Sequence, residues 1–206
     1  MKCKQCKSKF IPKYFNQKYC LINDECIKAH VENVKSKQTI QKKKENKAKL
    51  NDLQPKGYWL GKLQEEINQI VRLIDKDCPC ISSGRPYRSD DQAGHFYSVG
   101  STPALRFNLL NLWSQSIKDN MHNSGNLLNY REQLVKFDII DLIEDEKRKY
   151  PTLKLSIEEI KEAISKAKIV KKVMIELNSD VFNPRSVIKR VELRQEFNRY
   201  LEIYKA

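Results

Sequence analysis

Four cysteines near the start of the chain limit what this sequence can fold into more than any other feature. Cys3 and Cys6 are separated by two residues, and Cys20 and Cys26 by five. A segment this short cannot bury enough apolar surface to fold alone, but four thiolates can hold one zinc ion in a tetrahedron. Because MKCKQCKSKF lacks the apolar core of a secretion signal, we expect reduced thiols in the cytoplasm. We therefore predict a zinc-finger-like module over residues 1–27; the alternative is a tail with free thiols.

Aromatic and basic residues alternate between the two cysteine pairs, namely Lys9, Phe10, Lys13, Tyr14, Phe15, Lys18 and Tyr19. We expect the rings to pack around the metal while the lysines point outward. The alternative is that some of the rings stack on unpaired bases of a nucleic acid.

The positive charge of the chain is concentrated in its first quarter. The formal net charge is +13; residues 1–49 hold 14 Lys and Arg against 4 Asp and Glu, and residues 50–206 hold 25 against 22. This distribution predicts an acidic polymer as the partner, bound through contacts that weaken with salt. No apolar run approaches the roughly 20 residues that a helix needs to cross a bilayer.

A lysine-rich segment without Gly or Pro follows the cysteines. Ile27, Val31 and Val34 recur at helical spacing after Asp24, a candidate N-cap, so we predict a basic helix or linker over residues 28–54. This segment either lies along DNA phosphates or serves as a charged spacer. The lysines that we expect to contact DNA are Lys35, Lys37, Lys42, Lys43, Lys44 and Lys47.

Residues 55–135 carry the side chains most able to do chemistry. An apolar stripe over residues 59–74 predicts an amphipathic helix that packs in the core. His95 follows in the alternating run AGHFYSVG, which is typical of a strand, and residues 117–123 have a helical pattern. A histidine on a strand that faces polar side chains of a helix is an arrangement found in nucleases.

Helical patterns fill the remainder of the chain. We expect helices over residues 138–150, 156–177 and 185–204, the second opened by a capping box of Ser156 and Glu159. The apolar stripe of the last helix comprises Ile188, Val191, Phe197, Tyr200, Leu201 and Tyr204. These stripes need a partner, either each other in a helical hairpin or a second subunit in a homodimer. The patterns predict a mainly α fold around a small ββα core, with a C-terminal helical tail over residues 136–206.

The segment around His95 resembles the HNH (His-Asn-His) nuclease core of the NinG/Rap family, phage recombination proteins that act on branched DNA. The matching stretches are Pro79–Gly84, Ala93–His95, Leu105–Phe107, Asn111, Gln115–Asn120, Ser124–Asn126 and Tyr130–Arg131. Together with the cysteines and the basic segment, the resemblance extends from residue 1 to about residue 145. It implies a ββα (His-Me finger) core and a metal-dependent endonuclease for Holliday junctions or D-loops, with other recombination proteins as candidate partners.

One part of the family pattern is not kept. Two Cys-x-x-Cys pairs would supply four zinc ligands in the family, whereas the corresponding positions here are Cys80, Ser83, Ser116 and Asp119. Serine hydroxyls are poor zinc ligands, so we predict that this degenerate knuckle holds no zinc. A hydrogen-bonded serine cluster could hold the same turn, with Cys78 as a further contributor.

The resemblance also implies roles for other polar residues of the core. His95 would take a proton from water, Asn111 would orient His95 through a hydrogen bond, and Asn120 would bind a catalytic Mg²⁺ or Mn²⁺. Gly94 stands where other HNH enzymes carry a metal-binding carboxylate. Candidate helpers for the metal are Asp90, Asp91, His122 and Asn126, and candidate phosphate contacts are Arg106 and Arg131. The alternative function is a branched-DNA-binding accessory protein without catalysis.

Overall fold

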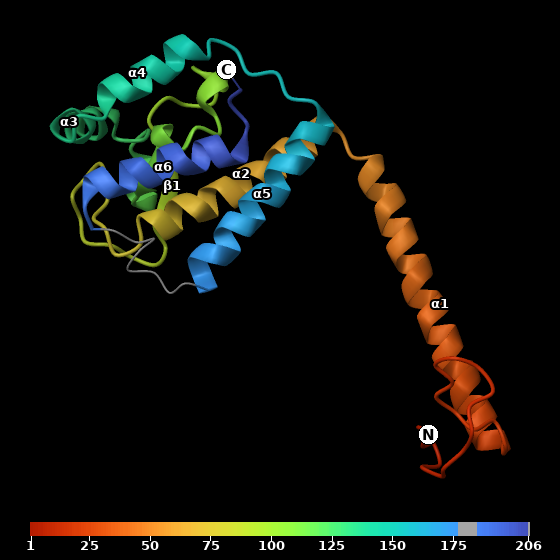
Figure 1. Ribbon diagram of the computed structural model, residues 1–206. Helices are drawn as coiled ribbons and strands as arrows, with labels where there is room; N and C mark the ends of the chain where they lie inside the picture. Colours follow the sequence, from red (N-terminus) through yellow and green to blue (C-terminus); the bar gives the residue numbers. More distant parts are fainter. Residues whose placement is uncertain (177–184, 206) are drawn as a thin grey trace. The chain divides into compact units, whose positions relative to one another are not determined.

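The computed structural model of the protein describes residues 1–176 and 185–205, which form two compact units, Met1–Gln54 and Pro55–Ala206 (Figure 1). The predicted mainly helical class is confirmed, and the described residues contain one sheet of two strands. Leu177, the predicted end of a C-terminal helix, lies outside the described residues. No helix within the described ranges is both long enough and apolar enough to span a membrane.

The N-terminal unit consists of a cysteine-bearing loop region and one long helix, α1, Asp24–Asp52. The N-cap is Asn23, one residue before the predicted Asp24, and its side chain accepts a hydrogen bond from the backbone N–H of Cys26. Beyond Cys26 the described side chains of this helix include none that is buried. The six lysines predicted to contact DNA are all exposed on α1.

The aromatic residues between the cysteine pairs divide into two groups. Tyr19 is buried and Phe10 packs against the cysteines, as predicted. Tyr14 and Phe15 are instead exposed over 49% and 92% of their surface. The expectation that all four rings pack around a metal is therefore wrong for these two, because their loop closes around Gln17 and not around the cysteines.

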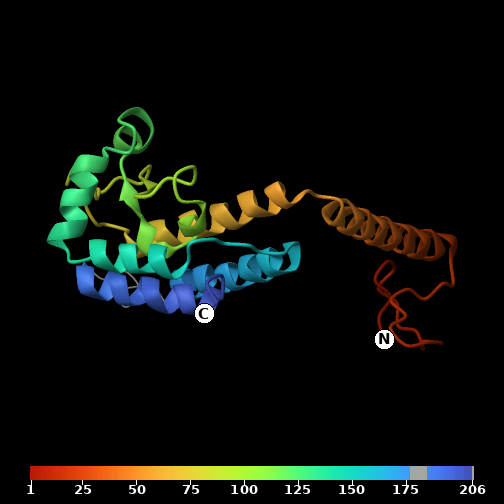
Figure 2. The same cartoon turned by 90° about the horizontal axis from the view of Figure 1, so that it is seen from above.

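Two long helices that lie side by side form the base of the second unit: α2, Lys56–Ile74, and α5, Ile157–Glu176 (Figure 1, Figure 2). The predicted stripe of α2 is buried from Leu63 to Ile74. The inward side chains of α5 are Ile160, Ala163, Ile164, Ala167, Val170 and Met174. The capping box is also confirmed, because the Ser156 and Glu159 side chains accept each other's backbone N–H groups over 3.1 and 2.8 Å.

An antiparallel hairpin of β1, Gln92–His95, and β2, Leu112–Gln115, packs on α2. The first strand ends at His95, earlier than the alternating run suggested. A Cβ atom on Gly94 would lie 2.1 Å from Oε1 of Gln115. Any larger residue directly before the histidine would therefore require the buried Gln115 side chain to move.

Short helices connect and follow the strands. The 3₁₀ turns η1, Pro103–Leu105, and η2, Leu109–Asn111, lie between β1 and β2. The π-helix η3, Lys118–His122, coincides with the helical pattern predicted over residues 117–123. It is followed by α3, Leu127–Lys136, and α4, Ile140–Lys149, the latter within the predicted range 138–150.

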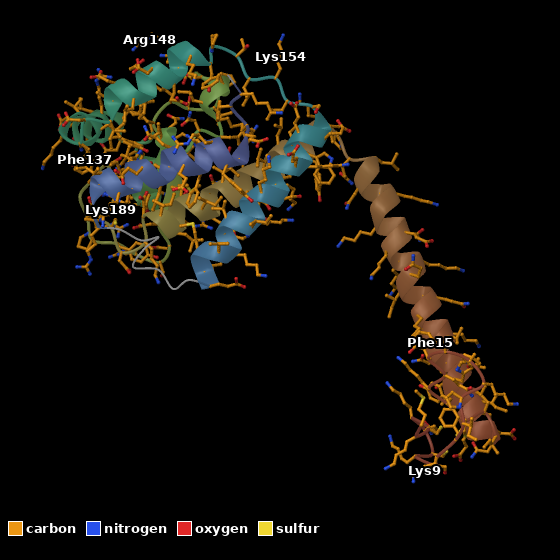
Figure 3. The ribbon with its side chains drawn as sticks, in the orientation of Figure 1. Lys9, Phe15, Phe137, Arg148, Lys154 and Lys189 are labelled. Atoms are coloured by element: carbon orange, nitrogen blue, oxygen red, sulfur yellow. The ribbon has the colours of Figure 1, made fainter. Side chains whose placement is uncertain are left out.

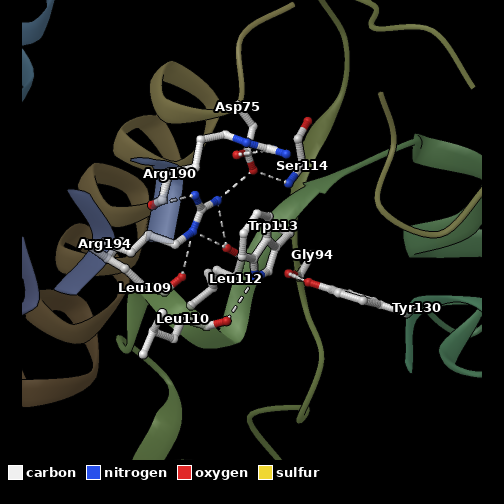
Figure 4. A network of polar contacts seen from close by, with 10 residues as sticks. All are labelled: Asp75, Gly94, Leu109, Leu110, Leu112, Trp113, Ser114, Tyr130, Arg190 and Arg194. Atoms are coloured by element: carbon white, nitrogen blue, oxygen red, sulfur yellow. Dashed lines mark hydrogen bonds and ion pairs between the residues drawn. The ribbon is translucent and has the colours of Figure 1, made fainter. Parts of the chain in front are cut away.

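Figure 4 shows a buried polar network that joins the last helix, α6, Val187–Leu201, to the hairpin. Nη1 of Arg190 and Nη2 of Arg194 donate to the two carboxylate oxygens of Asp75, over 3.0 and 2.7 Å. The Asp75 carboxylate also accepts the backbone N–H of Ser114 in β2. The Arg194 guanidinium lies 3.7 Å from the centroid of the Trp113 ring. The network therefore ties α6 to the region just after α2 and to the hairpin.

This packing corrects the predicted face of the last helix. Ile188 and Tyr200 are 72% and 45% exposed, because the two arginines occupy the inward face. Phe197 and Leu201 do join the main core, which draws on residues both before and after position 136. The buried stripe of α5 faces α2, so it does not require a second subunit.

Candidate functional site

A cavity of about 730 Å³ opens beside the end of β1. Its walls come from the end of β1 with the loop that follows, from η3 and from the first turns of α3. His95, Asn120 and Arg131, each from a different one of these segments, line the cavity together. The structure thus brings together three of the predicted site residues.

His95 occupies the last position of β1 and is partly exposed. Its Nε2 lies 3.0 Å from the backbone carbonyl oxygen of Arg106. A carbonyl oxygen can only accept a hydrogen bond, so Nε2 carries the proton and Nδ1 is the basic nitrogen. Burial lowers the pKa of His95 and outweighs the opposing effect of the carbonyl, while the Arg106 charge lowers the pKa further. The ring is therefore neutral at pH 7 and can accept a proton at Nδ1.

Asn111 is not hydrogen-bonded to His95, which corrects the predicted bond between them. Its Oδ1 accepts the backbone N–H of Tyr97 over 2.8 Å, and its Nδ2 donates to the carbonyls of Tyr97 and Leu105 over 3.0 and 3.2 Å. The side chain is fully buried. Asn111 therefore fixes the loop after His95 and the turn before Arg106, and it bears on the imidazole only through them.

Asn120 extends from η3 into the cavity that contains His95. Its Nδ2 donates to Oε1 of Gln92 over 2.8 Å, which leaves Oδ1 as the group able to bind a metal ion. No carboxylate is among the residues that line the cavity. Mg²⁺ is usually held by one or two carboxylates together with substrate phosphates. An ion bound here would therefore take most of its ligands from DNA and water.

The other candidate metal ligands lie outside this cavity. Asp91 is buried and forms an ion pair with Arg85. Asp90 and His122 line a different hollow of about 590 Å³. Asn126 bonds to the carboxylate cluster described below. The structure does not bring these four candidates to His95.

The two arginines predicted to contact phosphates are placed differently. Arg131 lines the cavity from α3. Nε of Arg106 donates to Oε1 of Gln64 on α2 over 3.1 Å, and burial lowers the pKa of the guanidinium. Of these two arginines, Arg131 is therefore the one that faces the cavity.

The positions of the degenerate zinc knuckle form a closed hydrogen-bonded cluster around Asp119. Oδ2 of this carboxylate accepts from the Ser116 hydroxyl over 2.6 Å and from the Cys80 thiol over 3.5 Å. Oδ1 accepts from the amides of Asn123 and Asn126 over 3.2 and 2.9 Å. The backbone N–H of Ser116 donates to the Cys80 sulfur over 3.2 Å. Hydrogen bonds thus close the turn that four thiolates would close around zinc.

The cluster keeps the Asp119 carboxylate ionised. Burial raises its pKa, but hydrogen bonds from Ser116, Ser83, Asn126 and Asn123 outweigh burial and hold the pKa well below its usual value.

Cys78, the further contributor considered for this turn, has no hydrogen bond to the cluster. Its backbone N–H donates to the backbone carbonyl of Asp75, and burial raises the pKa of its thiol.

Among the described residues, one group of Cys, His, Asp and Glu is close enough to share a metal ion: Cys3, Cys6, Cys20 and Cys26. Their sulfur atoms all lie within 4.8 Å of one another, with 3.7 Å between Cys3 and Cys26 and between Cys6 and Cys20. Four sulfurs around zinc at Zn–S distances of about 2.3 Å are separated by about 3.8 Å, whereas a disulfide requires about 2.05 Å. The four predicted ligands can therefore hold an ion such as zinc.

The two buried thiols of this group differ in acidity. Burial raises the pKa of Cys3, but backbone N–H groups, led by that of Cys20, outweigh it and lower the pKa to about 6. Burial and the neighbouring thiols raise the pKa of Cys26 to about 12. A bound cation would compensate both the burial and the mutual repulsion of four thiolates.

Sequence patterns did not single out two features of the cavity. Gln92 holds the Asn120 amide, and Leu127 and Leu128, which are 48% and 72% exposed, line the cavity wall. The sequence does contain a sign of the second feature, because Leu128 precedes Arg131 by three residues and therefore lies on the same face of α3.

Comparison with known proteins links the chain to phage proteins. The family model described as Bacteriophage Lambda NinG protein matches residues 1–176. Protein ninG of Escherichia phage lambda is 32% identical over 151 residues, covering 65% of this chain and 73% of the relative. Protein ninG of Salmonella phage P22 is 30% identical over 169 residues, covering 72% and 82%. No solved structure matches the chain.

Proposed function

Because this chain belongs to the NinG family of bacteriophage proteins, we propose that it is a metal-dependent endonuclease of the HNH type that cuts branched recombination intermediates such as Holliday junctions or D-loops. The observation that carries the proposal is the placement of His95. His95, whose Nε2 is bonded to the Arg106 carbonyl, lines an open cavity together with Arg131 and Asn120. A general base, a phosphate contact and a metal ligand could meet in one such site.

In the proposed reaction, Nδ1 of His95 takes a proton from a water molecule as that water attacks the scissile phosphate. The Arg106 carbonyl keeps the ring oriented and stabilises the imidazolium that forms, since a charged donor strengthens the hydrogen bond to it. Arg131 would hold a phosphate oxygen of the DNA strand in the cavity. General-base catalysis of this kind accelerates reactions by about 10²–10⁴-fold.

Asn120 Oδ1 is the protein group that would hold Mg²⁺ or Mn²⁺. Such an ion, when bound, stabilises the negative charge that develops on the phosphate and the leaving oxygen. Because no carboxylate lines the cavity, we expect the ion to bind weakly in the absence of DNA.

The N-terminal unit would hold the DNA while the second unit cuts it. Its exposed lysines on α1 can neutralise phosphates and release counterions, which gives an affinity that falls steeply with salt. A four-way junction has two-fold symmetry, so paired cuts need two copies of the protein, and we propose that two copies assemble on the junction.

The test replaces His95 with alanine. His95→Ala should reduce Mg²⁺- or Mn²⁺-dependent nicking of a four-way junction by about 10²-fold or more, with junction binding unchanged. His122→Ala is the matched control, because this histidine is exposed and lines a different hollow. Equal activity of His95→Ala and wild type would contradict the assignment of the base.

A second candidate function is a branched-DNA-binding accessory protein without catalysis, and the absence of carboxylates from the cavity lining favours it. The two candidates differ in one result. Wild-type protein that binds junctions but nicks neither branched nor linear DNA with any divalent metal supports the accessory role and contradicts the nuclease.

A further inference from the structure

The loop between the two cysteine pairs displays large apolar side chains to solvent. Ile11 and Phe15 are exposed over 90% and 92% of their surface, and Tyr14 over 49%. Figure 3 labels Phe15, the most exposed large hydrophobic residue among those described. Several large apolar side chains exposed on one loop mark a binding site more often than a single exposed leucine does.

The conformation of this loop is fixed by a buried amide. Gln17 is 2% exposed; its Oε1 accepts the backbone N–H of Lys13 over 2.7 Å, and its Nε2 donates to the Tyr19 carbonyl over 2.8 Å. The backbone N–H of Gln17 also donates to the Tyr14 carbonyl over 3.3 Å. Phe15 therefore extends from a loop that is closed at its base, so little conformational entropy is lost when the ring meets a ligand.

The charge around the loop selects the chemistry of the ligand. Residues 1–23 contain six lysines and no aspartate or glutamate, and all six lysines are exposed. An anionic ligand that also offers flat apolar surface fits this combination. Unpaired bases of DNA do so, because each base presents a ring face beside a phosphate, whereas paired bases hide their faces in the stack.

We infer that Tyr14 and Phe15 form a base-stacking site that binds unpaired nucleotides of DNA. The site would give the N-terminal unit a preference for branch points and gaps over continuous duplex. Its role in branch recognition rests on the function proposed above, but its binding to unpaired DNA does not depend on cleavage. Stacking on one aromatic ring contributes roughly a tenfold gain in affinity or more per base.

The experiment measures binding of the zinc-loaded full chain, without added Mg²⁺ or Mn²⁺, to two fluorescent probes. One is a continuous duplex, and the other is the same duplex with a short single-stranded gap. Phe15→Ala should weaken binding to the gapped probe about tenfold and leave duplex binding unchanged, while Phe15→Trp restores the preference. Ile22→Ala is the matched control, because Ile22 is 79% exposed in the same unit but lies outside the loop.

Two outcomes would overturn the inference. Equal loss of affinity for both probes would mean that the loop contacts DNA without reading unpaired bases. Unchanged affinity for both would mean that the loop does not contact DNA, and its exposed surface would then suit a protein partner. Neither outcome bears on His95, whereas a wild type that prefers the gapped probe but nicks no DNA would support this site and contradict the nuclease.

Discussion

The N-terminal cysteine group and the Asp119 cluster close comparable turns by different chemistry. Four sulfurs converge in the first, within a unit whose buried apolar residues are few. In the second, one thiol, a serine hydroxyl and two amides surround a carboxylate, within a unit that contains an extensive core of buried Leu and Ile side chains. From this difference we expect a metal ion to be needed where little apolar surface is buried, and hydrogen bonds to be enough where a core already holds the surrounding chain.

Removal of the metal should have the largest effect and should separate the two units. A zinc chelator should abolish the fold of residues 1–23, because the buried cluster of this unit is too small to hold the fold without the ion, and should leave the unfolding midpoint of the second unit unchanged. Hydrogen exchange measures the protection of backbone amides in both units in one experiment. Amides in residues 1–23 that stay protected in the chelator would show that the thiols hold the module without metal.

Loss of a buried ion-pair partner should be the largest single-residue effect on the second unit. Arg194→Ala leaves the Asp75 carboxylate buried with one guanidinium fewer, so we expect a loss of about 3–5 kcal/mol in the free energy of unfolding. Arg199→Ala on the exposed side of α6 should change it by less than about 0.5 kcal/mol. Urea unfolding measures the stability of both variants. Equal unfolding midpoints for Arg194→Ala and Arg199→Ala would contradict the stabilising role of the network.

Disruption of the Asp119 cluster should lower the free energy of unfolding by less than the loss of Arg194. Asp119→Ala removes hydrogen bonds to a charged group, which contribute about 1.5–3 kcal/mol each before the freed donors find water, so we expect a net loss of about 2–3 kcal/mol. The pKa of Asp119 is lowered on folding, so this stability is present above its ordinary pKa and is lost as the pH falls below it. In Asp119→Asn, the free energy of unfolding should therefore fall less steeply as the pH is lowered into the acid range. An unchanged acid limb would mean that the cluster does not hold the turn.

The pH dependence of nicking should show the smallest effect. Because burial lowers the pKa of His95, the base should remain deprotonated somewhat below pH 6.5, and the rate should fall only as the pH drops through the lowered pKa. A plot of kcat/KM against pH measures this limb. A rate that already falls above pH 7 would contradict a buried, neutral imidazole.

Periodic and local patterns were readable from the sequence. The stripe of α2, the capping box at Ser156 and the cysteine ligand set follow from side-chain spacing, because each depends on neighbours along the chain. The resemblance to a family placed His95 and Asn120 in one site, and both line the same cavity.

Contacts between distant segments were not readable. The Asn111 side chain forms hydrogen bonds with the backbone of Tyr97 and Leu105 and none with His95. Its partners depend on the path of the chain between β1 and β2, which the sequence pattern does not show. The inward face of α6 was missed because arginine side chains are ordinarily exposed. Asp75, more than a hundred positions earlier in the chain, makes the burial of Arg190 and Arg194 favourable. Phe15 was assigned to the metal-binding core because spacing cannot show that its loop closes on Gln17.

The zinc content of the purified full chain tests the central contrast most directly. We predict one zinc per wild-type chain, none in Cys26→Ser, and two in a variant that combines Ser83→Cys, Ser116→Cys and Asp119→Cys with Cys80. Two zinc ions in the wild type would place metal at the Asp119 cluster, and one zinc that survives Cys26→Ser would show that Cys26 is not needed to hold it; either result would contradict the account.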